Sequence, residues 1–178
     1  HVNRVWTNHL SQDPAKSKPY RQISASPSRI LDAPELRDDY YLNLLSWSND
    51  KILAVALNQT VYLWNAETGV INELNACVRP NDYVTSVSWV TQGNSHHLAI
   101  GTDHAEVQLW DATHAKQIRS MRGHAGRVGS LAWNATSLSS GSRDSTIFQH
   151  DVRTLRHHTS TYRGHHQEVC GLTWSPDG

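Results

Sequence analysis

Twelve histidines in a chain of 178 residues make metal binding the first chemistry to consider. The strongest candidates are three doublets, His96-His97, His157-His158 and His165-His166, the last of which lies near Cys170. Zinc requires four converging donors, and its protein ligands usually come in pairs at tight spacing. The doublets fall in separate segments of the chain. We therefore interpret them as turn and surface histidines and expect no metal and no other cofactor.

A second group of polar residues resembles a catalytic dyad. His124 and Asp144 have the side-chain types of a base and its orienting carboxylate, and either Ser140 or Ser142 could join them. However, the chain has no nucleophile elbow, phosphate-binding loop or carboxylate pair with a base. A buried polar network more often specifies a fold than performs a reaction, so we predict that the chain is not an enzyme.

Two Ser-Pro dipeptides are minimal sites for proline-directed phosphorylation. Ser26-Pro27 lies in a polar, Pro-containing stretch, and we retain Ser26 as a candidate phosphosite. Ser175-Pro176 begins a Ser-Pro-Asp-Gly sequence, and turn formation is a sufficient reason for that composition.

The strands and turns that carry these residues are predicted by a repeated sequence pattern. Trp47, Trp89, Trp133 and Trp174 each close a short apolar run, at separations of 42, 44 and 41 residues. Leucine or valine stands both five and two positions before each tryptophan. Runs of this length that end at similar positions predict β-strands with a common role in each repeat.

A second set of strands lies between the first ones. Val61–Asn65, Val107–Asp111 and Ile147–Asp151 end in Trp-Asn, Trp-Asp and His-Asp, and Gly123-His124 and Gly164-His165 supply turns. A repeat of about 40–45 residues with Trp-Asp and Gly-His elements is typical of a WD-repeat β-propeller. The predicted fold class is all-β, a partial propeller of about three blades plus one strand of an expected seven blades.

The expected organisation is an N-terminal linker followed by an incomplete propeller. Residues 1–30 hold five basic side chains against one acidic one, with three prolines, and predict an extended basic linker. The propeller is expected over 31–178, with its first strand at Tyr41–Trp47. The blades are predicted at about 40–76, 82–123 and 125–164, with the start of a fourth at 166–178.

Composition narrows the range of partners. The 16 basic and 16 acidic side chains balance, so no overall field favours nucleic acid or a membrane surface. No apolar run approaches the length of a membrane span, and no signal peptide is visible. Cys77 and Cys170 are too few for a disulfide framework and fit a reducing compartment.

The segment Arg29–Trp47, RILDAPELRDDYYLNLLSW, is more specific than a generic repeat strand. It closely resembles the start of the propeller in the Fizzy family, the substrate-recruiting activators of the anaphase-promoting complex, a ubiquitin ligase. The resemblance covers about residues 20–178 and continues through the segments 53–57, 61–64, 105–111, 125–131, 138–143 and 167–172. It implies an activator that binds degrons, which are short destruction signals in substrates.

Two branches of the family remain open. Asp39-Tyr40-Tyr41 and Ala105-Glu106-Val107 are similar to the mitotic branch, whereas Ser142-Arg143-Asp144 is closer to the Fizzy-related branch of late mitosis and G1. We favour the mitotic branch. A general WD-repeat interaction scaffold and a histidine-dependent metalloenzyme are the alternatives from other functional classes.

The resemblance also implies a binding site for the destruction box, an Arg-x-x-Leu element. Asp32 would pair with the degron arginine, and a pocket for the leucine would be lined by Leu31, Pro34, Val55, Tyr62, Trp64 and Ile71. Burying a leucine side chain contributes roughly 1.5–3 kcal/mol. Judged from the residue types alone, the favoured interpretation is that Leu31 and Val55 are ordinary core between blades and that Asp32 and Glu35 belong to a solvated acidic stretch.

Further sites and partners follow from the same resemblance. Asp39, with Tyr40 beside it, matches a position that holds the lysine of the Lys-Glu-Asn box, and Arg119 matches part of a third groove between blades 2 and 3. The implied partners are subunits of the anaphase-promoting complex, cyclin-like and securin-like substrates, and mitotic checkpoint proteins. The implied location is the nucleus and cytoplasm.

Overall fold

The computed structural model describes residues 23–92 and 96–177. The chain divides into two compact units, residues 1–32 and residues 33–178. In the first unit, the described residues 23–32 form neither helix nor strand. Most of the predicted linker, residues 1–22, lies outside the described residues. Every strand among the described residues belongs to the second unit.

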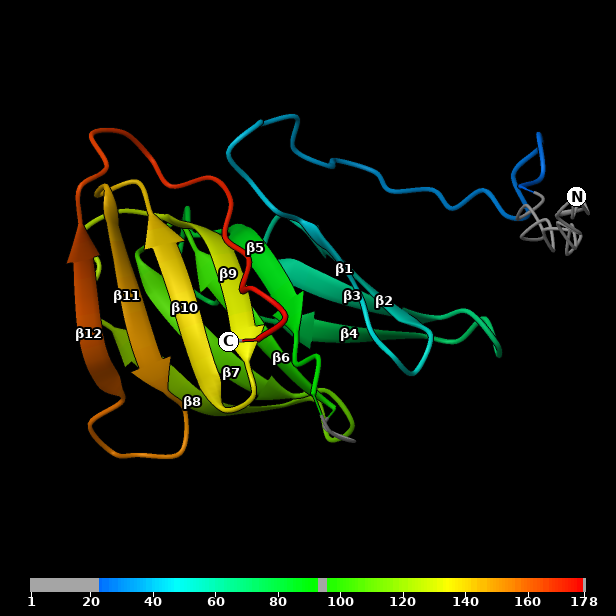
Figure 1. Cartoon of the computed structure of the whole chain (residues 1–178). Helices are drawn as coiled ribbons and strands as arrows, with labels where there is room; N and C mark the ends of the chain where they lie inside the picture. Colours follow the sequence, from blue (N-terminus) through cyan, green and yellow to red (C-terminus); the bar gives the residue numbers. More distant parts are fainter. Residues whose placement is uncertain (1–22, 93–95, 178) are drawn as a thin grey trace, which may run out of the picture. The chain divides into compact units, whose positions relative to one another are not determined.

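Three antiparallel sheets of four strands make up this second unit (Figure 1). Each sheet is a simple meander, and we call the sheets blade 1, blade 2 and blade 3. The strands of blade 1 are β1 (Leu45–Trp47), β2 (Ile52–Leu57), β3 (Thr60–Asn65) and β4 (Ile71–Asn75). Those of blade 2 are β5 (Val84–Trp89), β6 (His97–Thr102), β7 (Glu106–Asp111) and β8 (Lys116–Arg122). Those of blade 3 are β9 (Val128–Asn134), β10 (Ser137–Ser142), β11 (Thr146–Asp151) and β12 (His158–Arg163).

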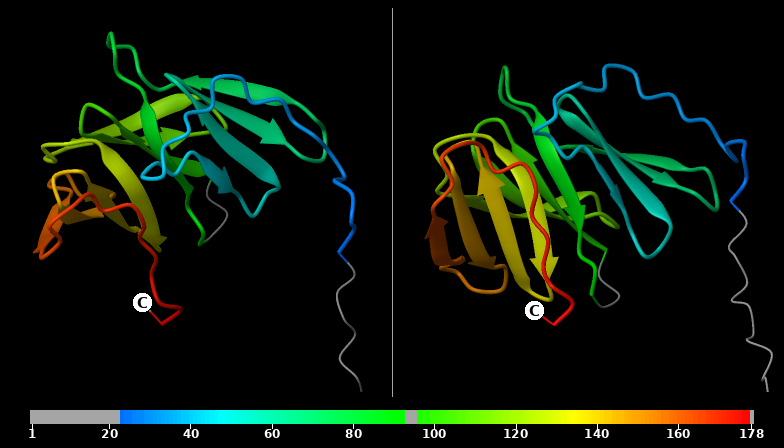
Figure 2. Two further views of the ribbon diagram at one scale, coloured as in Figure 1. Left: turned by 90° about the horizontal axis from the view of Figure 1, so that it is seen from above. Right: turned by 45° about the horizontal axis from the view of Figure 1, so that its top comes forward.

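The predicted fold class is confirmed by this arrangement of three WD-type blades. The blades stand side by side, and the neighbouring contacts run through β1, β5 and β9, the first strand of each (Figure 2). β6 and β9 are buried along almost their whole length. This burial explains why several strands are apolar on both faces, because a blade between two neighbours is covered on both sides.

The repeated tryptophans fasten each blade to the one before it. Trp89 Nε1 donates to the Ser46 carbonyl at 3.2 Å, Trp133 Nε1 to the Ser88 carbonyl at 3.0 Å. Trp89 and Trp133 are only 3% and 7% exposed. Each ring therefore fills the core between two blades while its single polar atom is satisfied, as a buried indole requires.

Glycine allows close packing at one position of the second strand in blades 2 and 3. A Cβ on Gly101 would lie 2.3 Å from Ser86 Oγ and 2.6 Å from the Val128 carbonyl oxygen. A Cβ on Gly141 would lie 2.3 Å from Ser130 Oγ and 2.5 Å from Val169 Cγ1. The second strand of blades 2 and 3 thus has no room for a side chain at this position.

The first strand is shorter than predicted. We expected Tyr41–Trp47, but β1 begins at Leu45. The preceding residues turn toward blade 2 instead, where Asn43 forms an isolated parallel bridge with Ser86. The Asn43 amide also donates to the carbonyls of Gly129 at 2.6 Å and Cys170 at 2.9 Å. A side chain that joins three segments explains why the regular strand starts later.

The predicted first strand of a fourth blade is not formed. Residues 164–177 contain no strand, although Trp174 Nε1 donates to the Ala132 carbonyl at 3.3 Å, as its counterparts do. A strand requires a ladder of backbone hydrogen bonds to a neighbour. Among the described residues, this segment has only a single such bond to a strand, from the Val169 amide to the Ser142 carbonyl at 3.1 Å. The segment is therefore placed like an inner strand but is not paired as one.

The described part of the chain contains no helix of the length and apolar character that a bilayer span needs. All its regular structure is β-strand.

Candidate functional site

One face of blade 1 gathers four of the residues predicted for the destruction-box pocket. Val55 pairs with Tyr62 across β2 and β3, and Trp64 pairs with Ile71 across β3 and β4. Side chains directly opposite in neighbouring strands lie on the same face, and every second residue returns to that face. The pocket residues therefore share one surface, while Ala54 and its neighbours on the other face pack into the core with blade 2.

The sequence analysis missed three apolar residues on this surface. Leu45 pairs with Val55, and Trp47 pairs with Leu53, which pairs in turn with Trp64. Leu45 and Trp47 are 57% and 56% exposed, and the rings of Trp47 and Trp64 meet edge to face at 6.3 Å. The alternation of residues along β1 and β2 could have revealed them. We call this surface, which comprises Leu45, Trp47, Leu53, Val55, Tyr62, Trp64 and Ile71, the blade 1 face.

The blade 1 face is an unusual feature for a water-exposed sheet. Ile71 is 58% exposed, like Leu45 and Trp47. Large contiguous apolar patches on soluble proteins generally mark a surface that another structure covers. The equivalent tryptophans of blades 2 and 3 are buried against the preceding blade, so the blade 1 face is where either another blade or a ligand would pack.

The other predicted residues of the pocket, and the candidate phosphosite, lie before the first strand. Leu31 and Asp32 are exposed and belong to the first unit. Pro34 is exposed at a turn that starts the second unit. Ser26, the candidate phosphosite, is exposed in the first unit and lies beside Ser24.

Asp39 is held by an arginine that sequence reasoning did not single out. Arg127 donates from one terminal nitrogen to Asp39 Oδ2 at 2.7 Å. It also donates from Nε and the other terminal nitrogen to the Glu168 carboxylate, at 2.7 and 3.0 Å. The Arg127 hydrogen bond, followed by one from the Tyr41 amide, lowers the pKa of Asp39 below its ordinary value. We call Asp39, Arg127 and Glu168 the carboxylate clamp.

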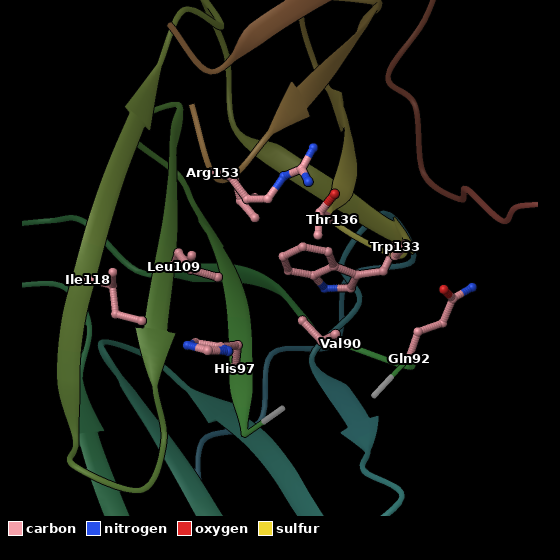
Figure 3. Close-up of a pocket in the computed structure, with 10 residues that line it drawn as sticks. Val90, Gln92, His97, Leu109, Ile118, Trp133, Thr136 and Arg153 are labelled. Carbon is pink, nitrogen blue, oxygen red and sulfur yellow. The ribbon is translucent and has the colours of Figure 1, made fainter. Parts of the chain in front are cut away.

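Arg119, predicted in a groove between blades 2 and 3, makes structural hydrogen bonds. Its guanidinium donates to the Val152 carbonyl at 2.8 Å and the Leu155 carbonyl at 2.7 Å, in the turn between β11 and β12. The neighbouring Ile118 lines a mainly apolar cavity of about 500 Å³ between the two blades, with Leu109 and Trp133 (Figure 3). A groove therefore exists at this boundary, but the Arg119 guanidinium is directed at the turn.

Replacement of Arg119 by methionine is expected to lower the free energy of unfolding by about 2 kcal/mol, because the carbonyls of Val152 and Leu155 lose charged donors. Urea unfolding followed by tryptophan fluorescence measures the change. Arg163→Met, on the exposed outer strand, is the matched control and should shift stability by less than about 0.5 kcal/mol. Equal stability of the two variants would contradict the structural role of Arg119.

The set that resembles a catalytic dyad is a buried network in blade 3. His124 contacts Asp144 Oδ2 at 3.0 Å and Ser140 Oγ at 2.9 Å, and Ser140 Oγ contacts His150 Nε2 at 2.8 Å. Ser140 is thus the partner, whereas Ser142 bonds to the Gly126 carbonyl. The groups satisfy one another and Ser140 is fully buried, so the network can fix the blade but is closed to a substrate.

The pKa values in this network follow from burial. Burial, followed by the nearby His157, His124 and His158, lowers the pKa of His150 to about 3. Burial also lowers the pKa of His124, although Asp144 opposes the shift. For Asp144, burial acts to raise the pKa, but hydrogen bonds led by Thr146 outweigh it and hold the pKa at about 2.

Blade 2 uses another network where Gly-His is absent. Trp110 Nε1 donates to Gln108 Oε1 at 2.7 Å, and Gln108 Nε2 donates to the Ala76 carbonyl at 3.0 Å. Glu106 accepts from Gln108 and from Ser120. These contacts satisfy the buried tryptophan without a histidine.

In the described residues, no group of three His, Cys, Asp or Glu side chains converges as a metal site.

The four-stranded blades, the interblade tryptophans and the His-Ser-Asp network define a WD-repeat propeller. The family model described as "WD domain, G-beta repeat" matches residues 115–151 and 152–178. The crystal structure of a mitotic checkpoint complex contains a chain that superposes with a TM-score of 0.84 at 44% identity, covering 99% of this chain and 53% of that chain.

Curated relatives identify the family. "Anaphase-promoting complex subunit cdc20" of Dictyostelium discoideum is 56% identical over 93% of this chain and 33% of its own length. "Protein FIZZY-RELATED 3" and "Cell division cycle 20.1, cofactor of APC complex" of Arabidopsis thaliana are each 47% identical, over 95% and 99% of this chain. The chain belongs to the Cdc20/Fizzy family of WD-repeat proteins. It spans about a third of the length of these relatives.

Proposed function

We propose that this chain is the degron-reading part of an activator of the anaphase-promoting complex, a non-enzymatic adaptor that holds substrates for ubiquitin transfer. The 56% identity to a relative named as a Cdc20 subunit of that complex carries the proposal. Fizzy-related relatives of Arabidopsis thaliana are 47–49% identical, level with the 47% of the Cdc20 relatives of the same plant, so the preference for the mitotic branch rests on the 56% identity to the Dictyostelium relative. An adaptor of this kind works by proximity, because tethering raises the effective concentration of the substrate.

The blade 1 face supplies a physical reason for peptide binding. An exposed apolar sheet face with two tryptophans can bury the leucine of an Arg-x-x-Leu element, and Tyr62 on β3 adds a third aromatic ring to this face. The arginine of the element requires a carboxylate, and Asp32 is the proposed partner, with Leu31 and Pro34 completing the pocket. The mechanism needs no cofactor.

A second peptide site is proposed at Asp39. Its carboxylate is 32% exposed, and Tyr40 is 86% exposed beside it, with the rings of Tyr40 and Tyr41 edge to face at 5.7 Å. An ammonium group is attracted both to a carboxylate and to aromatic faces. We propose that Asp39 and Tyr40 accept the lysine of a Lys-Glu-Asn box.

The proposed partners are subunits of the anaphase-promoting complex, cyclin-like and securin-like substrates, and mitotic checkpoint proteins. Similarity to a chain in a mitotic checkpoint complex supports the last of these. We further propose that the protein works in the nucleus and cytoplasm, which imaging of a fluorescent fusion through the cell cycle would test. Phosphorylation at Ser26 is a proposed modification of the exposed N-terminal segment.

Binding of a fluorescent destruction-box peptide to the full protein that carries this chain tests the central proposal. The Asp32→Ala variant is expected to bind about tenfold or more weakly, because removing one partner of a charge pair leaves the other unpaired. Asp38→Ala, in the same exposed acidic stretch, is the matched control and should bind like the wild type.

Two results would contradict this proposal. If the wild type shows no preference for Arg-x-x-Leu over Ala-x-x-Ala peptides, the protein is a WD-repeat scaffold that does not read this degron. If both aspartate variants bind normally, the arginine partner is not Asp32. Stoichiometric zinc in the purified protein would support the metalloenzyme alternative instead.

A further inference from the structure

Four equivalent positions of the repeat meet around Arg127. Tyr41, Tyr83, Arg127 and Glu168 each stand one residue before the valine or leucine that opens an inner segment. Arg127 is bonded to Glu168, and its guanidinium carbon lies 5.9 Å from the centre of the Tyr41 ring. Residues far apart in sequence therefore converge on one cation because the repeat places them at the same level of their blades.

The carboxylate clamp has one more negative charge than positive charge. Two carboxylates share one guanidinium, so the group has a net charge of about −1 at neutral pH. Arg127 is 11% exposed and Glu168 is 9% exposed, whereas Asp39 is 32% exposed. The excess negative charge is thus accessible at Asp39. A second cation that arrived from solvent would neutralise the group at that carboxylate.

The geometry of Asp39 is fixed from two sides. Its Oδ1 accepts from the Tyr41 amide at 3.0 Å, and its Oδ2 accepts from Arg127 at 2.7 Å. A carboxylate can accept about four hydrogen bonds, so both oxygens keep capacity for a further donor. A carboxylate already oriented by the protein does not lose side-chain freedom when a ligand binds, and that lowers the cost of binding.

We propose that Arg127 is the positioning residue for a lysine side chain that binds at Asp39. It does not touch the ligand. Its fork orients the Asp39 carboxylate, while Glu168 occupies the other side of the fork. This inference rests on the proposed role of Asp39, and it adds the residue on which that role depends.

The planar fork of arginine is essential to this role. Lysine would preserve the charge, but one ammonium group on a flexible stem cannot hold two carboxylates in fixed directions. With lysine at position 127, the more buried Glu168 would keep the cation and Asp39 would be released. Glutamine would remove the charge and leave Glu168 buried without a partner, which destabilises the fold as well.

The test is a double-mutant cycle, in which Arg127 of the protein and the lysine of the peptide are replaced separately and together. Fluorescence anisotropy measures binding of a Lys-Glu-Asn peptide, and of the same peptide with norleucine for lysine, to the full protein that carries this chain. Wild type is expected to prefer lysine by about fivefold, the upper range for a partly exposed pair. Arg127→Lys, which keeps the charge of the group, should reduce this preference to about twofold or less. Arg127→Gln also makes the group more negative, so any loss of preference in that variant occurs against a stronger attraction for the ammonium group.

Controls separate positioning from folding. Arg153→Lys is the matched control, since Arg153 pairs with Asp151 on an exposed turn, and it should keep the full lysine preference. Tryptophan fluorescence and destruction-box binding report whether each variant is folded. Arg127→Lys retains the charge, so it keeps the test decisive if Arg127→Gln does not fold.

The possible failures are distinguishable. If the wild type binds the lysine and norleucine peptides equally, Asp39 is not a lysine acceptor, and the proposed second site fails. If the wild type prefers lysine and both folded Arg127 variants keep that preference, the positioning role is overturned. Equal losses for both peptides, together with loss of destruction-box binding, would show that Arg127 acts only through the fold and would also overturn the inference.

Discussion

Replacement of Gly141 by valine is expected to lower the free energy of unfolding by about 3 kcal/mol or more. A Cβ at this position would lie 2.3 Å from Ser130 Oγ, 2.5 Å from Val169 Cγ1 and 2.9 Å from Val169 Cβ. Overpacking a close contact typically costs 1–3 kcal/mol, and valine adds two methyl groups beyond its Cβ. To remove the clash with the valine side chain, β10 would have to separate from β9 or from the segment around Val169.

Gly171→Val is the matched control for this prediction. A Cβ on Gly171 would meet nothing within 4 Å, and its backbone does not lie in the left-handed region. Urea unfolding followed by tryptophan fluorescence is expected to show a large loss of stability for Gly141→Val and a change within about 0.5 kcal/mol for Gly171→Val. Similar stabilities for the two variants would contradict the close packing of Gly141 against β9 and the segment around Val169.

Acidification from pH 7 to pH 4 is expected to remove about 3 kcal/mol of stability through His150 alone. The pKa of His150 is lowered from 6.5 to about 3 in the folded protein, chiefly by burial. The unfolded chain therefore binds more protons than the folded one below about pH 6.5. The stabilisation is complete above that pH and is lost progressively as the pH falls toward 3.

The groups that face His150 reinforce this effect. His157 Nδ1 lies 2.9 Å from His150 Nδ1, so at least one of the two rings must be neutral to accept the hydrogen bond. Arg119 from blade 2 and the rings of His124 and His158 also disfavour a charge on His150. Asp144 is hydrogen-bonded to His124, so no carboxylate among the described residues is bonded to His150.

Unfolding titrations at several pH values measure this dependence. His150→Phe is expected to reduce the slope of stability against pH between 6.5 and 4, and His166→Phe, at an exposed position, is the control that leaves the slope unchanged. Because phenylalanine removes the bond to Ser140, the comparison concerns the slope and not the absolute stability. An unaltered slope in His150→Phe would contradict the assignment.

The sequence by itself determined the blades. Tryptophans at intervals of 41–44 residues, with valine or leucine at fixed positions before them, located every blade. The predicted strands Val61–Asn65, Val107–Asp111 and Ile147–Asp151 lie within β3, β7 and β11. This success has a local cause, since strand alternation and turn residues are properties of neighbouring positions. The segment 29–47 likewise pointed to the family that the relatives then confirmed.

The tertiary structure decided which residues meet. Arg127 reaches Asp39 across 88 positions of sequence, and no local pattern marks that pair. Arg119 proved to bind a turn of the next blade. Trp47 shares the repeat position of Trp89 and Trp133 but is exposed, because burial depends on a neighbouring blade and not on residue type. Contacts between blades are set by packing over the whole propeller, so the sequence pattern fixed the strands and left their partners open.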